Sequence, residues 1–131
     1  MLTGSCHCGR LNWRFDGAPH EATICNCSVC RRYGVIWIYG YEADGVSVTG
    51  DSRIYKTDRA RLEFHFCPDC GCITAWRMAE ATADGRRRMA VNLRLTEDQD
   101  VIRTIPLGRY DGLHETGEMK RDGRMVADLM P

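Results

Sequence analysis

The chain reads GSCHCG at residues 4–9 and FCPDCG at residues 66–71, two cysteine pairs with the spacing of metal-binding motifs. In an extended segment, residues i and i+2 point to the same side, so both cysteines of the first pair can reach one ion. In the second pair, the proline presets φ for a turn, and the glycine suits the position where the chain leaves it. Four thiolates suit a closed tetrahedral zinc site. The predicted ligands of this structural zinc are Cys6, Cys8, Cys67 and Cys70.

A third motif, CNCSVCRR at residues 25–32, places three cysteines in one short loop. Three protein ligands leave a tetrahedral zinc ion with one open position, which distinguishes catalytic from structural zinc sites. Cys25, Cys27 and Cys30 are therefore predicted to hold a second, open zinc. Three thiolates with one Zn²⁺ carry a net negative charge, which Arg31 and Arg32 could offset while they also bind an anionic substrate.

The same cysteines are compatible with different arrangements. Cys72 could supply a fourth ligand and close the second site, although a lone cysteine is most often a small buried hydrophobe. The three-cysteine loop could be a metal-free group of redox thiols, and one of the two pairs could be buried thiols without a metal. Disulfides are not expected, because a bridge needs a specific Cα separation that cysteines one or two residues apart rarely satisfy.

Alternating apolar and polar residues predict a mainly β protein. The strands predicted in this way lie at residues 11–15, 46–48, 62–66 and 89–95, and the continuous apolar run at residues 35–39 predicts a buried strand. Asp-Gly, a dipeptide that favours hairpin turns, recurs at residues 16–17, 44–45, 84–85, 111–112 and 122–123. One helix is predicted over about residues 97–103, because TEDQ at residues 96–99 has the form of a capping box.

The chain has 131 residues, the size of one domain, with 18 basic and 18 acidic side chains. We expect a single domain over residues 1–131 whose tail, from about residue 114, packs loosely. Balanced charge argues against nucleic acid or membrane as a partner, although the three arginines at residues 86–88 could touch phosphate or form a solvated hairpin end. No apolar run approaches the ~20 residues of a membrane span. The first residues lack a secretion signal, so we expect a cytoplasmic protein.

Four segments together resemble the glutathione-dependent formaldehyde-activating enzyme family, to which centromere protein V is similar. They are GSCHCG, CNCSVCRRYG, FCPDCG and VNLR, at residues 4–9, 25–34, 66–71 and 91–94, and the resemblance covers roughly residues 3–110. The resemblance implies a zinc-stapled β-tent of antiparallel hairpins and small sheets, with at most one or two short helices. It also implies that the second zinc takes up the thiol of glutathione.

The activity implied by the resemblance is that of a carbon–sulfur lyase, an S-(hydroxymethyl)glutathione synthase that joins glutathione to formaldehyde. A zinc with an open position favours deprotonation of a bound thiol, and the thiolate attacks the small carbonyl. The expected cofactors are zinc at two sites, the second of them labile, with glutathione as the thiol co-substrate. The expected partners are a small thiol and a small aldehyde, and Arg31 and Arg32 are candidates for the glutathione carboxylates.

Two other functions compete with this one: a non-catalytic zinc-binding interaction module, and a thiol redox or metal-transfer protein. The breadth of the family and the basic residues 86–88 favour the module, and the density of thiols favours the redox protein. Residue type alone selects no general acid or base, since several histidines are available. They are His7, His20, His65 and His114.

Overall fold

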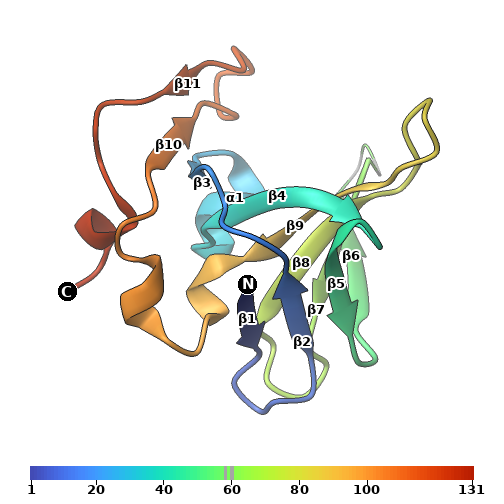
Figure 1. Cartoon of the computed structure of the whole chain (residues 1–131). Helices are drawn as coiled ribbons and strands as arrows, with labels where there is room; N and C mark the ends of the chain where they lie inside the picture. Colours follow the sequence, from blue (N-terminus) through green and yellow to red (C-terminus); the bar gives the residue numbers. More distant parts are fainter. Residues whose placement is uncertain (58, 60) are drawn as a thin grey trace.

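The structure, a computed structural model, describes residues 1–57, 59 and 61–131, and eleven strands of this part of the chain form one sheet (Figure 1). The main path of the sheet runs β1-β2-β5-β4-β9-β8-β7-β6. These strands are β1 (Leu2–Ser5), β2 (Asn12–Phe15), β4 (Trp37–Glu42), β5 (Gly45–Thr49), β6 (Arg53–Lys56), β7 (Leu62–Phe66), β8 (Ile73–Met78) and β9 (Arg88–Asn92). A branch from β4 contains β3 (Ala22–Cys25), β10 (Leu107–Tyr110) and β11 (Met119–Lys120). The predicted mainly β class is confirmed.

Most strand pairs are antiparallel, but β3 pairs with β10 in parallel, as β4 does with β5. The Asp-Gly pair at residues 84–85 lies in the connection between the antiparallel strands β8 and β9, as predicted. The pairs at residues 16–17 and 44–45 do not form antiparallel hairpins, because the first leads from β2 to the non-adjacent β3 and the second leads into the parallel contact. Gly17 and Gly45 still adopt positive φ, so the dipeptide specifies a turn and leaves the pairing to the strands.

The two larger apolar clusters of the core lie on opposite faces of β4 and β9. Ile38 and Val91 belong to the larger cluster, whereas Trp37 and Ala90 belong to the smaller one. Because successive residues of a strand point to opposite faces, a strand between two clusters has apolar residues at every position. The strand predicted at residues 35–39 is therefore confirmed from Trp37 on, whereas Val35 and Ile36 are buried but precede β4. The smaller cluster also contains Cys30, so the three-cysteine loop rests on the core.

The helices differ from the prediction. The α-helix of the described residues is α1 (Ser28–Tyr33), which was not predicted, and residues 97–103 form only the short 3-10 helix η2 (Gln99–Ile102). Thr96 does not cap it, because its hydroxyl donates to the Leu93 carbonyl at 2.8 Å and closes the preceding 3-10 helix η1 (Leu93–Leu95), and Asp98 caps η2 instead. Within the described residues, no helix combines the length and the apolar character that a membrane crossing requires.

The last residues of the chain return to the core. Val126, which begins the 3-10 helix η3 (Val126–Leu129), is fully buried in the larger cluster. Its backbone N–H donates to the Ile105 carbonyl at 2.9 Å, and the next N–H, from Ala127, donates to the Arg103 carbonyl at 3.0 Å. In Figure 1 this segment runs back from β11 along the side of the molecule that carries β10. The C-terminal segment therefore packs beside the strands that carry the three-cysteine loop.

Candidate functional site

The four cysteines of the first two motifs meet where the turn after β1 lies beside the turn after β7. The sulfurs of Cys6, Cys8, Cys67 and Cys70 all lie within 4.8 Å of one another. The Cys8 sulfur is 3.6 Å from that of Cys6 and 3.5 Å from that of Cys67. Cys6 and Cys67 are buried, whereas Cys8 is exposed. This group brings together the four residues predicted for the structural zinc, and its donor set suits zinc.

Both turns that supply these cysteines are closed by the backbone N–H of a glycine, the first over three residues and the second over four. A glycine N–H donates to the first cysteine's carbonyl at 2.9 Å in each turn, from Gly9 to Cys6 and from Gly71 to Cys67. Both glycines have positive φ, which permits the tight reversal. Backbone N–H groups also point at the sulfurs, and the N–H of Cys72 lowers the pKa of the Cys70 thiol to about 5. The pKa of the Cys67 thiol is lowered as well, chiefly by the Cys70 backbone N–H, so the second turn favours thiolates, the form that binds metal.

Cys72 lies beside the four-cysteine group rather than beside the three-cysteine loop. It packs against the small cluster of Cys6, Leu11 and Cys67. Its carbonyl accepts the Cys67 N–H at 3.0 Å, which fixes it at the base of the second turn. The interpretation that Cys72 closes the second site is therefore not supported, because the chain places it at the other cysteine group.

The three-cysteine loop is built on the start of α1. Cys25 ends β3, Cys27 is the N-cap of α1, and the buried Cys30 lies in the first turn. Their three sulfurs lie within 4.8 Å of one another, and no further histidine, cysteine or carboxylate of the described residues joins this group. The helix ends at Gly34, whose positive φ lets its N–H donate back to the Cys30 carbonyl at 3.0 Å. The C-x-C-x-x-C spacing thus encodes one capped helical turn, which the residue pattern did not predict.

Each sulfur of this loop accepts one N–H group. The backbone N–H of Cys27 donates to the Cys25 sulfur and that of Cys30 to the Cys27 sulfur, both at 3.4 Å. The indole Nε1–H of Trp37 donates to the Cys30 sulfur at 3.4 Å, and Trp37 is only 1% exposed. The Cys30 thiol in turn lowers the pKa of Cys25 to about 6, and this contact together with burial raises the pKa of Cys30. The loop thus disperses negative charge on its sulfurs.

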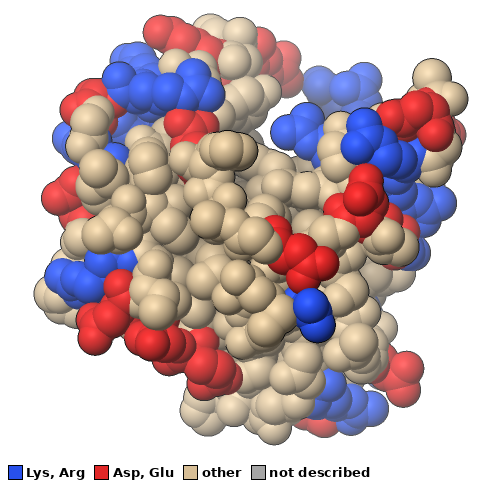
Figure 2. Space-filling view, viewed as in Figure 1, with Lys and Arg blue, Asp and Glu red and all other residues tan. Residues whose placement is uncertain are grey.

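The arginines of the two basic segments differ in their surroundings. Arg31 and Arg32 are exposed in the last turn of α1, and neither takes part in an ion pair among the described residues. Arg86 pairs with Asp84 at 2.9 Å and with Asp44 at 3.5 Å. Figure 2 likewise shows basic and acidic side chains mixed over this face, most of them around its edges. The free positive charge next to the cysteines is therefore that of α1.

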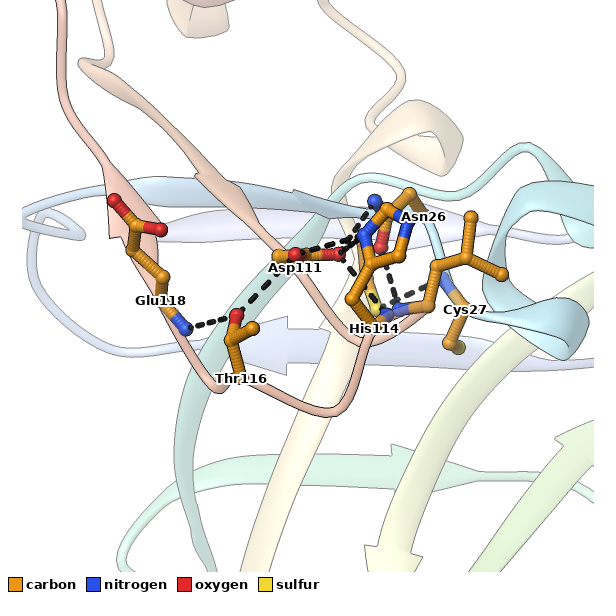
Figure 3. Close-up of polar contacts among 8 residues, drawn as sticks. Asn26, Cys27, Asp111, His114, Thr116 and Glu118 are labelled. Carbon is orange, nitrogen blue, oxygen red and sulfur yellow. Dashed lines mark hydrogen bonds and ion pairs between the residues drawn. The ribbon is translucent and has the colours of Figure 1, made fainter.

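A polar network borders the three-cysteine loop on its outer side (Figure 3). Asp111 accepts hydrogen bonds from the Asn26 amide at 2.9 Å and from the Thr116 hydroxyl at 3.2 Å, and its two oxygens both lie 3.0 Å from His114 Nδ1. The Asn26 contact is the largest of the influences that lower the pKa of Asp111 to about 2. The sequence predicted only a turn at residues 111–112. No sequence pattern indicates a role for Asn26, because its partners lie more than eighty positions away.

A cavity of about 350 Å³ lies elsewhere, along β1, β2 and β5. Its walls include Ser5, Trp13 and Arg14, and no cysteine lines it. The chemistry of the chain is therefore located by the two cysteine groups rather than by this cavity.

Comparisons with known proteins agree with the cysteine motifs. The family model described as "Glutathione-dependent formaldehyde-activating enzyme" matches residues 1–104. A protein of Halomonas elongata, provisionally named as a glutathione-dependent formaldehyde-activating enzyme, is 33% identical over an alignment of 81 residues, and the match covers 53% of this chain and 52% of that protein. The chain thus spans about half the length of the curated relative it matches. A crystal structure of a Rhodobacter sphaeroides protein has a TM-score of 0.62 at 23% identity, over 81% of this chain and 99% of that chain, and shows a similar fold.

Proposed function

Because the chain belongs to the glutathione-dependent formaldehyde-activating enzyme family, we propose that it joins a low-molecular-weight thiol, glutathione or a similar one, to a small aldehyde with the help of zinc. The reaction makes a carbon–sulfur bond, so the enzyme is a carbon–sulfur lyase of the S-(hydroxymethyl)glutathione synthase type. One observation supports this most directly. Three cysteine sulfurs lie within 4.8 Å of one another, which gives a tetrahedral metal three ligands and leaves one position for a thiol.

The two cysteine groups have different roles in this proposal. Cys6, Cys8, Cys67 and Cys70 would hold a structural zinc, because four thiolates complete a tetrahedral shell. Cys25, Cys27 and Cys30 would hold the second zinc, which when bound lowers the pKa of a thiol at its open position. The chain's own contribution is the set of N–H groups on the three sulfurs, which keeps the ligands oriented and disperses their charge.

The reaction balances without a further reactant. The thiol loses its proton, its sulfur forms a bond to the aldehyde carbon, and the carbonyl oxygen takes up a proton to become the hydroxyl of the product. Glutathione carries two carboxylates, and the guanidinium groups of Arg31 and Arg32, which have no carboxylate partner among the described residues, are suited to bind and orient them beside the cysteines. One Arg32 nitrogen donates to the Ser28 carbonyl at 2.8 Å, which leaves its other N–H groups for a ligand. These arginines would thus make the enzyme prefer a thiol compound that carries carboxylates over an uncharged one.

Two further features complete the proposal. Residues 1–131 act as one domain, because Val126 near the C-terminus is buried in the same cluster as Trp13 near the N-terminus. Seven thiolates reserved for metal need a reducing compartment, which is consistent with the cytoplasm.

Isothermal titration tests this function. We expect the zinc-loaded protein to bind glutathione at millimolar or lower concentration, and S-methylglutathione, which has no thiol, to bind much more weakly. Replacing both Arg31 and Arg32 by alanine should weaken glutathione binding about fivefold or more, from roughly 1 kcal/mol for exposed charge pairs. The binding of 2-mercaptoethanol, which has no carboxylate, should not change. Arg14→Ala on β2 is the matched control. Equal binding of the two glutathione compounds would contradict the proposal.

A further inference from the structure

Asn26 ties the three-cysteine loop to a segment near the end of the chain. It lies between two of the cysteines, and it makes three hydrogen bonds to residues 110–113, including the one to Asp111 drawn in Figure 3. Its backbone N–H donates to the Tyr110 carbonyl at 3.3 Å, and its amide NH₂ donates to Asp111 at 2.9 Å. Its amide oxygen accepts the Leu113 N–H at 2.9 Å. Both ends of one side chain are thus used to hold a single distant segment.

Gly112 brings the backbone of that segment against the cysteines. A methyl group on its Cα would lie 3.0 Å from the Cys25 sulfur and 2.9 Å from the Cys27 Cβ. Gly112 does not have positive φ, unlike the glycines of the other four Asp-Gly pairs. Space rather than backbone conformation therefore requires glycine here, because any side chain would push into the cysteine group.

Asp111 makes the segment rigid from within. Besides the Asn26 amide, its carboxylate accepts from the Thr116 hydroxyl and the His114 backbone N–H, and it lies beside the His114 ring. Its own N–H donates to the Glu118 carbonyl at 2.9 Å, which closes the loop between β10 and β11. The same loop is attached through β10, which pairs with β3 so that Tyr110 lies opposite Cys25. The loop is therefore preorganised before it meets the cysteines.

We propose that the segment at residues 110–118, which lies beyond residues 1–104 matched by the family model, is a component of the three-cysteine metal centre. Asn26 and Asp111 are positioning residues that fix the relative placement of Cys25 and Cys27, and Gly112 closes that side of the centre. An incoming thiol must then approach from a different side. The inference rests on the proposed function only in taking the three cysteines as metal ligands.

Metal affinity tests this proposal without any activity assay. Zinc is titrated against a chromophoric chelator under reducing conditions, and the four-cysteine group of the same molecule is the internal reference. We expect Asn26→Ala and Asp111→Asn to lower the zinc affinity of the three-cysteine site by about 10- to 100-fold, because losing partners that orient metal ligands has an effect of this size. The zinc affinity of the four-cysteine group should stay within twofold of wild type. Asp122→Asn is the matched control, because that aspartate pairs with Arg109 at 2.7 Å and with Arg124 at 3.5 Å.

Cobalt provides the second readout. In the cobalt-loaded protein, Asn26→Ala and Gly112→Ala should shift the thiolate-to-cobalt absorption bands of the second site, and Asp122→Asn should not. If Asn26→Ala or Asp111→Asn does not fold, Gly112→Ala still tests whether residues 110–118 belong to the three-cysteine centre.

Three outcomes separate this proposal from the proposed function. Second-site affinity within twofold of wild type in Asn26→Ala and Gly112→Ala overturns the positioning role and leaves the enzyme proposal standing. Weakened second-site affinity, with no thiol binding by the wild-type protein, supports the positioning role and overturns the enzyme proposal. A wild-type protein that binds only one zinc overturns both.

Discussion

Cys70→Ser should destabilise the zinc-loaded protein far more than Cys27→Ser. Cys8 and Cys67 are 59 positions apart, so a metal at the four-cysteine group closes a long loop of the unfolded chain. For a covalent cross-link, closing a loop of this length is worth about 4 kcal/mol of unfolding free energy. The three-cysteine group spans one short loop, and the same relation gives roughly 2 kcal/mol or less of unfolding free energy for closing that loop. For a chain of 131 residues, a loss of about 4 kcal/mol lowers the Tm by about 15 °C.

Thermal melting followed by circular dichroism measures this difference. Wild type, Cys70→Ser and Cys27→Ser are compared with zinc and a reducing agent, and wild type is compared again with excess chelator. We expect chelated wild type to melt near Cys70→Ser, because structural zinc contributes folding free energy directly, and Cys27→Ser to melt within several degrees of wild type. Equal Tm values for the two variants, or no effect of chelator on wild type, would refute the structural role of the four-cysteine group.

Two further substitutions test contacts in the core. Trp37→Phe removes the N–H donor to Cys30. In chelator competition it should weaken zinc binding at the three-cysteine site about fivefold, from roughly 1 kcal/mol per hydrogen bond. Trp76→Phe, which alters the ring packed edge-on against Trp37, should leave zinc binding unchanged. Gly4→Ala places a methyl 2.4 Å from the Trp13 ring and should lower the urea unfolding free energy by about 1–3 kcal/mol through overpacking; an unchanged midpoint would show that the ring moves freely.

The cysteine groups could be predicted from the sequence because each motif that supplies cysteines is a short, continuous segment. A C-x-C or C-x-x-C spacing places two sulfurs on one side of a strand or turn regardless of the rest of the fold. The alternation of Leu11, Trp13 and Phe15 was equally reliable, since all three are buried while Asn12 and Arg14 are exposed. In both cases a short stretch of chain contains the physical cause of its own geometry.

The features that were missed are of two kinds, local caps made by atypical residues or contacts and one pairing of residues far apart in the chain. Helix α1 has Cys27 as its N-cap, and cysteine is not a usual N-cap residue. The Cys27 sulfur accepts the Cys30 N–H in place of a hydroxyl or carboxylate oxygen. The expected helix after Thr96 failed because its hydroxyl bonds to a carbonyl on the preceding side. The Asn26–Asp111 contact joins residues 85 positions apart. No pattern within a window of the sequence contains that pairing.

The parallel pairing of β3 with β10 gives the two cysteine groups different histories during synthesis. A chain is made from its N-terminus at about 5–20 residues per second, so all four cysteines of the first group exist once Cys70 has been added. The three-cysteine loop is made earlier still, whereas β10 (Leu107–Tyr110) and Gly112 are made only after Cys70. The nascent chain therefore contains all four cysteines of the first group before it contains the segment that packs against the three-cysteine loop.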